Sequence, residues 1–478
     1  MVTITLTNPF TKELVFKEKS DSFATLSEKL ARSGAAFRKW SRLPVEQRAA
    51  LVRRALDTFR AEEDRISTAI ANEMGKPKAA AVEELTYMIE RAEYMCTFAE
   101  DGALRNLDLT RYHTTDFEGS IRYRGKGVIY IISPWNYPLF TSINGVICAL
   151  LSGNTVILKH TTTPSVGRLF EQAFGKMGDY ADLLINVTID YDVSAELIEK
   201  GEISHVVFTG SVQGGKAIQQ SIGRRALNDQ LASPFIEASL ELGSNDACYI
   251  AEDADLEKAI LWAIKIGRLH NSGQSCCAVK RVYVHASLHD AFVEKARAVM
   301  EAEINGDPLD KATTLGPLFG GEGAVKTLMS LVDDASSKGA KVVTGGATET
   351  VNGCVFLRPT LVTEVNHGMR IMKEETFGPV LPVMKVTSDE QAMELIADTC
   401  FGLTASIFTG SRARADKFLD ALDFGTLYVN RCNTVDARLG WIGHRHSGNG
   451  SVSLSPEGLR ALSNKTSLNI DGSGLQGE

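Results

Sequence analysis

A cysteine in the second half of the chain directly follows a polar, glycine-bearing turn. The segment NSGQSCCA occupies residues 271–278 and contains Cys276. Glycine lets a backbone approach a substrate closely, and backbone N–H groups at such a turn stabilise a thiolate or an oxyanion. A single cysteine is more often a small buried apolar residue, which is our expectation for the other seven cysteines. The setting of Cys276 instead predicts a nucleophile.

Two other segments carry groups that complement a nucleophile. Glu241 lies in LELGSN (240–245), between leucines and beside a glycine; partial burial would raise the pKa of its carboxyl group and suit it to act as a general base. Alone, this run is also typical of a helix end. Asn136 lies in SPWNYP (133–138), where two prolines stiffen the loop and the side-chain amide can donate to an oxyanion. Alone, that segment is equally a rigid turn.

The elements that must position these groups change character along the chain. Residues 21–100 show a recurring apolar face with mixed charges, interrupted by Pro44 and Pro77, which predicts helices. After residue 125, short β-branched runs alternate with helical stretches, and 127–135, 154–160 and 205–211 read as buried parallel strands.

A second set of alternating elements begins after Gly243. CYIAEDADLEKAILWAIK predicts a strand followed by a helix, and KRVYVHA, AKVVTGG, LPVMKVT, TASIFTG and GTLYVN predict further strands. The fold class is therefore α/β, with two doubly wound domains that meet near residue 242. Residues 110–125 and 461–470 fit neither core, and their alternating pattern predicts exposed strands that pair with another chain.

Composition excludes several classes of function. The chain has 478 residues, a net charge of −8 and no basic stripe, which argues against nucleic acid or an anionic membrane as partner. The eight cysteines form no C-x-x-C pair and no Cys/His spacing typical of zinc, so we expect reduced thiols and no metal. With no signal-peptide pattern and no apolar run near the ~20 residues of a membrane span, the predicted location is the cytoplasm.

Taken together and in order, the motifs resemble the aldehyde dehydrogenase superfamily along almost the whole chain. They are PWNYP (134–138), LKHTTTP (158–164), FTGSVQGG (208–215), LELGS (240–244), NSGQSC (271–276), EETFGPV (374–380) and a variant glycine motif, WIGHRHSGNG (441–450). The wording of these motifs is most similar to that in the succinate-semialdehyde dehydrogenase branch.

The resemblance implies a division of the chain into three parts. A Rossmann-like cofactor-binding domain would comprise 1–109 and 126–242, and a catalytic domain 243–457. A small β element for oligomerisation, with the C-terminal tail, would comprise 110–125 and 458–478. The resemblance also implies a homodimer or homotetramer.

It further implies a role for each motif. Cys276 is the nucleophile that forms a thioester with the aldehyde, Glu241 activates the water that hydrolyses it, and Asn136 with the backbone N–H of Cys276 holds the oxyanion. The implied cofactor is NAD or NADP, a small-molecule aldehyde is the substrate, and no metal is needed. The implied cofactor contacts are Trp135, Ser211 and Gly215 at the pyrophosphate, Lys159 and Glu375 at the riboses, and Phe377 at the nicotinamide end.

Two positions and one spacing depart from the family pattern. Ser244 stands where a second glycine is usual, and Val452 stands where an auxiliary glutamate is common. The spacing from Glu241 to Cys276 is about one residue longer than expected, and a bulge in the helix predicted over 256–270 would absorb the extra residue.

Cofactor choice and substrate stay open. Thr162 occupies the position where a glutamate would repel the 2′-phosphate of NADP, so we expect NADP to be accepted; neighbouring His160 would add weak positive charge, although a lone histidine is more often structural. An arginine common in succinate-semialdehyde dehydrogenases is replaced by Asn144. A substrate carboxylate would then need another cation, and the candidates are Arg438, His444, Arg445 and His446. The alternative is that these residues belong to a charged, solvated loop.

Two other functions and one regulatory hypothesis remain. A CoA-acylating aldehyde dehydrogenase would transfer the acyl group to CoA, but such relatives generally lack the base that Glu241 provides. A non-catalytic relative would be expected to have lost Cys276 or Asn136. The adjacent Cys276 and Cys277 also suggest a redox-sensitive vicinal disulfide.

Overall fold

The N-terminal part of the chain forms a layer of helices. The computed structural model describes residues 2–114, 116–160 and 162–471. Pro44 and Pro77 occupy the N-cap positions of α2 and α4, where a residue without an N–H is tolerated. The prediction of helices over 21–100 is therefore confirmed. The elements are β1 (Thr3–Thr7), β2 (Leu14–Lys19), α1 (Phe23–Trp40), α2 (Val45–Ala61), α3 (Glu63–Met74) and α4 (Lys78–Phe98).

The first sheet has five parallel strands in the order β11-β10-β5-β6-β9. The chain begins at the central strand β5, builds outward through β6 and β9, and then returns to add β10 and β11 on the other side. The carboxyl ends of β5 and β10 therefore flank the switch point of the sheet, where ligands bind in such folds. The strands are β5 (Val128–Ile132), β6 (Thr155–Lys159), β9 (Leu184–Val187), β10 (His205–Thr209) and β11 (Glu237–Glu241), and the helices α5 (Pro138–Leu151), α6 (Pro164–Phe174), α7 (Tyr191–Lys200) and α8 (Val212–Arg225).

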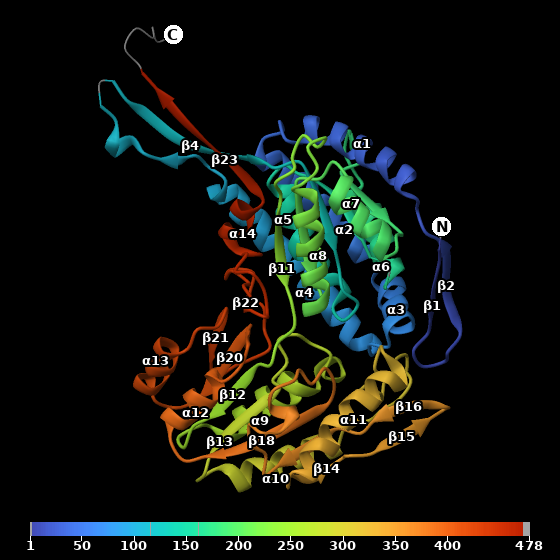
Figure 1. The fold of residues 1–478 in the computed structure, drawn as a ribbon, viewed down its shortest axis with the longest axis vertical. Coiled ribbons are helices and arrows are strands. Elements are labelled where there is room, and N and C mark those ends of the chain that lie inside the picture. The colour runs from blue at the N-terminus through green and yellow to red at the C-terminus, as the bar shows by residue number, and fades with distance from the viewer. Residues whose placement is uncertain (1, 115, 161, 472–478) are drawn as a thin grey trace.

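The second sheet has seven strands in the order β14-β17-β18-β13-β12-β20-β21, parallel except for β14. It lies in the lower lobe of Figure 1, and the helical layer and first sheet lie in the upper lobe. The strands are β12 (Ala247–Ile250), β13 (Arg281–His285), β14 (Lys341–Thr344), β17 (Thr360–Thr363), β18 (Val380–Val386), β20 (Thr404–Phe408) and β21 (Thr426–Val429). The helices of this lobe are α9 (Leu256–Ile260), α10 (His289–Glu301), α11 (Gly321–Ser337), α12 (Asp389–Ala397) and α13 (Arg412–Ala421). The last helix, α14 (Ser455–Ala461), returns to the upper lobe and packs on α4 and α5 (Figure 1).

The α/β prediction is confirmed, and so is the bulge. Helix α9 continues into a π-helical segment over Leu261–Leu269, and a π turn accommodates an extra residue within a helix. Within the two large sheets, strands β9, β11 and β17 were not predicted; each has only four or five residues. β11 carries Glu241 as its last residue, so this carboxylate ends a strand and not a helix.

A third sheet projects from the upper lobe (Figure 1). β4 (Glu118–Gly125) pairs antiparallel with β23 (Ser463–Ile470) along its whole length, and β3 (Leu107–Asp108) pairs with the other edge of β4. The strand prediction is confirmed for Glu118–Gly125 and Ser463–Ile470, which pair with each other, whereas Thr110–Tyr112 forms a 3-10 turn. Among the described residues, β23 has no neighbour on its outer edge; the end of the predicted tail, 472–478, lies outside the described residues.

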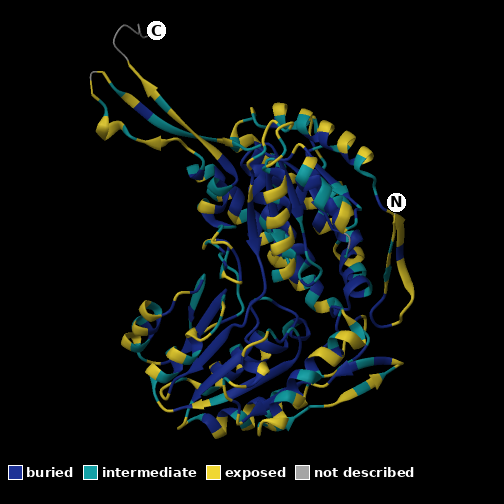
Figure 2. Cartoon of the chain, viewed as in Figure 1, coloured by how far each residue is buried: buried dark blue, intermediate teal, exposed yellow. Residues whose placement is uncertain are grey.

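Buried residues lie in the interiors of both lobes, whereas the projecting sheet consists mainly of exposed and half-buried residues (Figure 2). The chain passes from the first sheet to the second between Glu241 and Ala247, and we propose a domain boundary there. Within the described residues, no helix is long and apolar enough to cross a bilayer.

Candidate active site

The turn before Cys276 has an unusual backbone. Asn271, Ser272 and Gly273 adopt φ values of +53°, +55° and +73°, which is the left-handed region that L side chains rarely occupy. Such a conformation persists only where surrounding contacts hold it. The sequence predicted a glycine-bearing turn here, but not three consecutive left-handed residues.

Hydrogen bonds hold this turn against the loop after β5. The Asn271 side chain donates to the backbone carbonyl of Asn136 at 2.9 Å, and Asn136 donates from its own amide to the Gln274 carbonyl at 3.1 Å. The Ser272 hydroxyl donates to the Gly316 carbonyl at 2.9 Å. These reciprocal bonds bring the segment of Asn136 beside that of Cys276, although the two lie far apart in the sequence.

A buried arginine joins the turn to the EETFGPV segment. Arg268 donates to the carbonyls of Gly273 and Thr376, each at 2.8 Å, and burial lowers the pKa of its guanidinium to about 9. A Cβ on Gly273 would lie 2.4 Å from the Gly378 carbonyl oxygen, so only glycine fits there. Arg268 therefore links the NSGQSC and EETFGPV motifs by donating to a backbone carbonyl of each.

The two adjacent cysteines have different surroundings. Cys276 is half-buried, whereas Cys277 is buried and its thiol donates to the Asn433 side-chain oxygen at 3.1 Å. Both are free thiols, and the vicinal disulfide stays a prediction. The hydrogen bond to Cys277 and burial raise the pKa of the Cys276 thiol, and the ammonium of Lys280 acts in the opposite direction.

Glu241 is a buried carboxylate at the end of β11. Burial raises the pKa of its carboxyl group well above the ordinary range, and the Trp441 side chain opposes this shift. Its Oε2 atom has no hydrogen-bond partner among the described residues. An unpartnered buried carboxylate oxygen calls for an explanation, and a reacting water is one.

The predicted cofactor residues gather at the carboxyl edge of the first sheet. Lys159 ends β6, Trp135 follows β5, and Ser211 is the N-cap of α8 after β10. Burial lowers the pKa of Lys159 to about 8, while Asp190 raises it.

Ser211 and Gly215 also have structural roles. The Ser211 hydroxyl accepts from the backbone N–H of Gly214 at 3.1 Å and so caps α8. A Cβ on Gly215 would lie 2.7 Å from a methyl carbon of Leu242, so glycine lets α8 pack closely on the chain after β11.

Aromatic side chains from the two lobes contact one another. Trp135 stacks on Phe319 at 4.5 Å between ring centroids and meets Phe377 edge-on at 5.7 Å. The backbone N–H of Phe319 donates to the Gln274 side chain at 2.9 Å. Sequence reasoning missed Phe319, because a lone aromatic residue in a glycine- and proline-rich segment gives no chemical signal.

The other predicted cofactor residues differ in their surroundings. Glu375 accepts at Oε1 from the backbone N–H of Ser244 at 2.9 Å, and burial raises the pKa of its carboxyl group. Thr162 is half-buried. His160 is buried, bonds to the Thr163 hydroxyl at 2.8 Å, and has its pKa lowered to about 4 by burial, so it is a neutral structural residue.

These groups fit NAD or NADP. The N-terminus of α8 is accessible at Ser211, and its N–H groups suit a pyrophosphate. Lys159 offers a cation, and Glu375 offers a carboxylate that accepts from ribose hydroxyls.

A buried cation, Arg91, lies beside Asn144 on α5, the position where related enzymes commonly have an arginine. Arg91 of α4 donates to the Asn144 side chain at 2.8 Å and to the Val435 carbonyl at 3.1 Å. Its guanidinium lies over the Phe140 ring, 4.3 Å from the centroid, and burial lowers its pKa to about 10. Sequence reasoning missed Arg91, because nothing in the pattern of α4 distinguishes it from a surface arginine.

The cations that the sequence suggested have other neighbours. Arg438 pairs with Asp436 at 2.6 Å, and His444 pairs with Asp423 at 3.1 Å. Arg445 donates to the Asp423 backbone carbonyl at 2.8 Å, and His446 is exposed. The alternative reading of this segment, a solvated loop, therefore describes it better.

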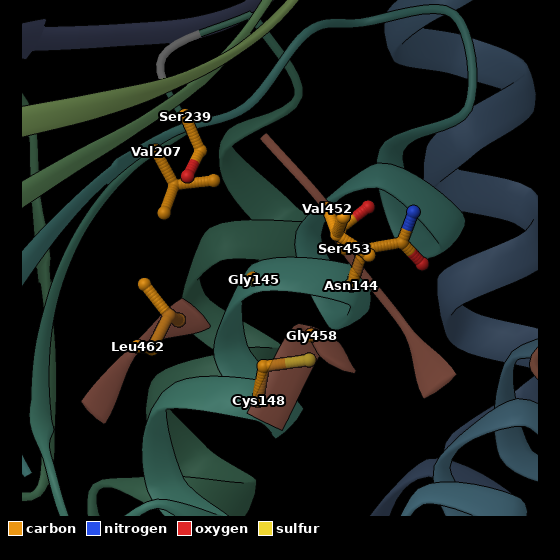
Figure 3. Close-up of a pocket in the computed structure, with 9 residues that line it drawn as sticks. All are labelled: Asn144, Gly145, Cys148, Val207, Ser239, Val452, Ser453, Gly458 and Leu462. Atoms are coloured by element: carbon orange, nitrogen blue, oxygen red, sulfur yellow. The ribbon is translucent and has the colours of Figure 1, made fainter. Parts of the chain in front are cut away.

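A small cavity adjoins Asn144. It has a volume of about 10 Å³, which is at the lower limit for one water molecule. Asn144, Val452 and Ser453 lie on one side of it, and Val207 and Ser239 lie on the other (Figure 3). The Ser453 hydroxyl has no partner among the described residues, and a single water would satisfy it.

Comparison with known proteins agrees with this geometry. Residues 2–468 match the aldehyde dehydrogenase family. A succinate-semialdehyde dehydrogenase [NADP(+)] of Deinococcus radiodurans is 32% identical over 96% of this chain and 93% of that protein. A glutarate-semialdehyde dehydrogenase of Pseudomonas putida is 31% identical over 90% and 86% of the two chains.

Solved structures show the same similarity. The crystal structure of succinic semialdehyde dehydrogenase from Streptococcus pyogenes, in complex with NADP+ as the cofactor, superposes with a TM-score of 0.90 at 27% identity, covering 98% of this chain and 100% of that one. The chain therefore belongs to the aldehyde dehydrogenase family, which confirms the prediction of an NAD(P)-dependent aldehyde dehydrogenase.

Proposed function

We propose that the chain oxidises a semialdehyde, an aldehyde with a carboxylate at its far end, through a thioester on Cys276. The observation that carries the proposal is the convergence of three motifs: Asn136 is hydrogen-bonded to the loop that carries Cys276, and buried Glu241 interacts electrostatically with the Cys276 thiol.

The first step is addition of the Cys276 thiolate to the aldehyde carbon. A carbon–sulfur bond forms, and the carbonyl π electrons move to oxygen. The backbone N–H of Cys276 and one N–H of the Asn136 amide have no partner among the described residues. Both suit a developing oxyanion, since preorganised donors are strongest where charge appears in the reaction.

The oxyanion then collapses and the carbon loses its hydride, which leaves a thioester on Cys276. Lys159, Ser211 and Glu375 would hold NAD or NADP at the carboxyl edge of the first sheet, where the cofactor would supply the hydride acceptor. Glu241 next takes a proton from water, and the water oxygen attacks the acyl carbon. The carbon–sulfur bond breaks, the carboxylate leaves and the thiolate returns.

Arg91 supports the choice of a semialdehyde. Its two hydrogen bonds to protein use only part of the five N–H groups of a guanidinium. The charge of Arg91 also interacts with the thiol of Cys277, next to the nucleophile. A substrate carboxylate would accept hydrogen bonds from the remaining N–H groups of this guanidinium, and hydrogen bonds between opposite charges are strong.

For the cofactor, we propose that NADP is accepted together with NAD. Thr162 places no negative charge opposite a 2′-phosphate. Tyr191 is 86% exposed and lies 5.3 Å from the Lys159 ammonium, measured to the ring centroid. It offers an aromatic face next to the lysine that the family uses for the ribose.

Assembly as a homodimer or homotetramer is a further part of the proposal. The support is the free outer edge of β23, because an unpaired strand edge is a template for another chain. Sedimentation of the chain shortened before residue 463 would then show a smaller particle.

The test is formation of reduced nicotinamide from a panel of aldehydes. Succinate and glutarate semialdehyde are compared with neutral aliphatic and aromatic aldehydes, each with NAD and with NADP, and Cys276→Ala is the control. Cysteine-dependent turnover with a preference for semialdehydes supports the proposal. Turnover that requires CoA would indicate the acylating alternative, which the presence of Glu241 disfavours. Cofactor binding without any turnover would indicate a non-catalytic relative.

A further inference from the structure

A fully buried lysine, Lys280, is hydrogen-bonded to the backbone of the proposed nucleophile, Cys276. Lys280 precedes β13, and its side chain is 0% exposed. Its ammonium donates to the Ser275 carbonyl at 2.8 Å, to the Ser244 hydroxyl at 2.8 Å and to the carbonyl of Cys276. An ammonium has three N–H groups, and here each has an acceptor.

Ser244, the residue that departs from the family's glycine, completes this arrangement. Its hydroxyl donates to the Cys276 carbonyl, and its backbone N–H donates to Glu375. Glu375 lies 3.6 Å from the Lys280 ammonium. Lys280 and Ser244 therefore connect the peptide of the nucleophile to the carboxylate proposed to hold a ribose.

This position is an unusual one for a buried charge. An ammonium leaves water at a high free-energy penalty unless it is paired and hydrogen-bonded. A merely structural lysine would be satisfied by any set of acceptors, but two of the acceptors of Lys280 are carbonyls of the nucleophile loop. Fixing the Cys276 carbonyl limits the directions in which the Cys276 side chain can point.

The positive charge of Lys280 also affects the pKa of the Cys276 thiol. The charged and titratable groups that act on Cys276 are Cys277, Lys280 and Glu241. Of these, Lys280 lowers the pKa of the Cys276 thiol and the other two raise it. A nearby cation of this kind is a general way to activate a cysteine.

We propose that Lys280 and Ser244 are positioning residues, which fix the Cys276 peptide and keep a positive charge beside the thiol so that the sulfur is ready to attack. This inference rests on the proposed role of Cys276 as nucleophile. Neither residue touches the reacting atoms; both act through the backbone of Cys276 and through charge.

The experiment is alkylation of Cys276 by iodoacetamide as a function of pH, without cofactor or substrate. Peptide fragmentation distinguishes Cys276 from Cys277. Lys280→Met is expected to raise the midpoint of alkylation by about one pH unit or more, which is roughly a tenfold loss of reactivity below it. Lys280→Arg keeps the charge and is expected to restore most of the shift.

Two variants make the result interpretable. Lys265→Met removes a half-exposed lysine that pairs with Glu303, and it is expected to leave the midpoint unchanged. Ser244→Ala removes only the hydroxyl, so it is expected to lower kcat severalfold with a smaller change in midpoint and with KM for the aldehyde little affected.

A folded Lys280→Met with the wild-type midpoint and wild-type kcat would overturn the inference. Should that variant fail to fold, Ser244→Ala decides, and wild-type kcat together with wild-type alkylation would overturn the inference. Failure of the proposed function is seen separately, as turnover that persists in Cys276→Ala.

Discussion

Glu84 connects α4 to the loop that carries Asn136, and its loss has a predictable consequence. Its side chain is buried and pairs with the ammonium of Lys76, which is also buried. Its Oε1 atom accepts from the backbone N–H groups of Leu139 at 2.8 Å and Phe140 at 3.0 Å. These are first-turn N–H groups of α5, which have no acceptor within the helix.

Glu84→Gln separates the two functions of this carboxylate. Glutamine keeps an oxygen for the helix N–H groups but leaves the Lys76 ammonium buried without a counter-charge. Removing one partner of a buried ion pair costs about 3–5 kcal/mol. At roughly 2–4 °C per kcal/mol for a domain of this size, Tm should fall by about 6–20 °C.

The assay is a thermal melt of each variant, followed by the rate of aldehyde oxidation. Lys76→Met combined with Glu84→Gln removes both charges and is expected to be more stable than either single variant. Asp57→Asn disrupts the exposed pair with Arg60 and should cost less than about 1 kcal/mol. The reasoning is refuted if Glu84→Gln melts like Asp57→Asn, or if the double variant loses as much as the two single variants combined.

Three further outcomes follow from the site. Thr162→Glu should raise KM for NADP at least tenfold relative to KM for NAD, since a carboxylate repels the 2′-phosphate; equal KM changes would contradict the placement of this residue. Arg91→Met should lose about 1.5–3 kcal/mol of binding to a substrate carboxylate, seen as a roughly 10- to 150-fold larger KM for succinate semialdehyde but not for a neutral aldehyde. Glu241→Gln should give a burst of reduced nicotinamide followed by slow turnover. Because burial raises the pKa of Glu241, wild-type thioester hydrolysis should fall as pH drops through that pKa, and this limb of the pH profile should vanish in the variant.

Much of the framework follows from local sequence. Apolar periodicity and two prolines predicted α1 to α4, and β-branched runs predicted β5, β6 and β10, because these signals act within a few residues. The segments of Cys276, Glu241 and Asn136 were recognisable because each combines a reactive side chain with turn-forming neighbours. The extra residue before Cys276 was likewise predicted to form a bulge, and the π-helical segment over Leu261–Leu269 has that form.

What only the tertiary structure decided is which distant groups complete the site. Arg91 reaches Asn144 from another helix, Lys280 and Ser244 meet at the Cys276 carbonyl, and Phe319 lies on Trp135. None of these contacts has a sequence signal, because a buried charge is satisfied by whichever acceptors the packed chain brings within about 3 Å of it. The sequence by itself determined which chemistry is present, and the packing of two sheets and a helical layer decided which charges act on it.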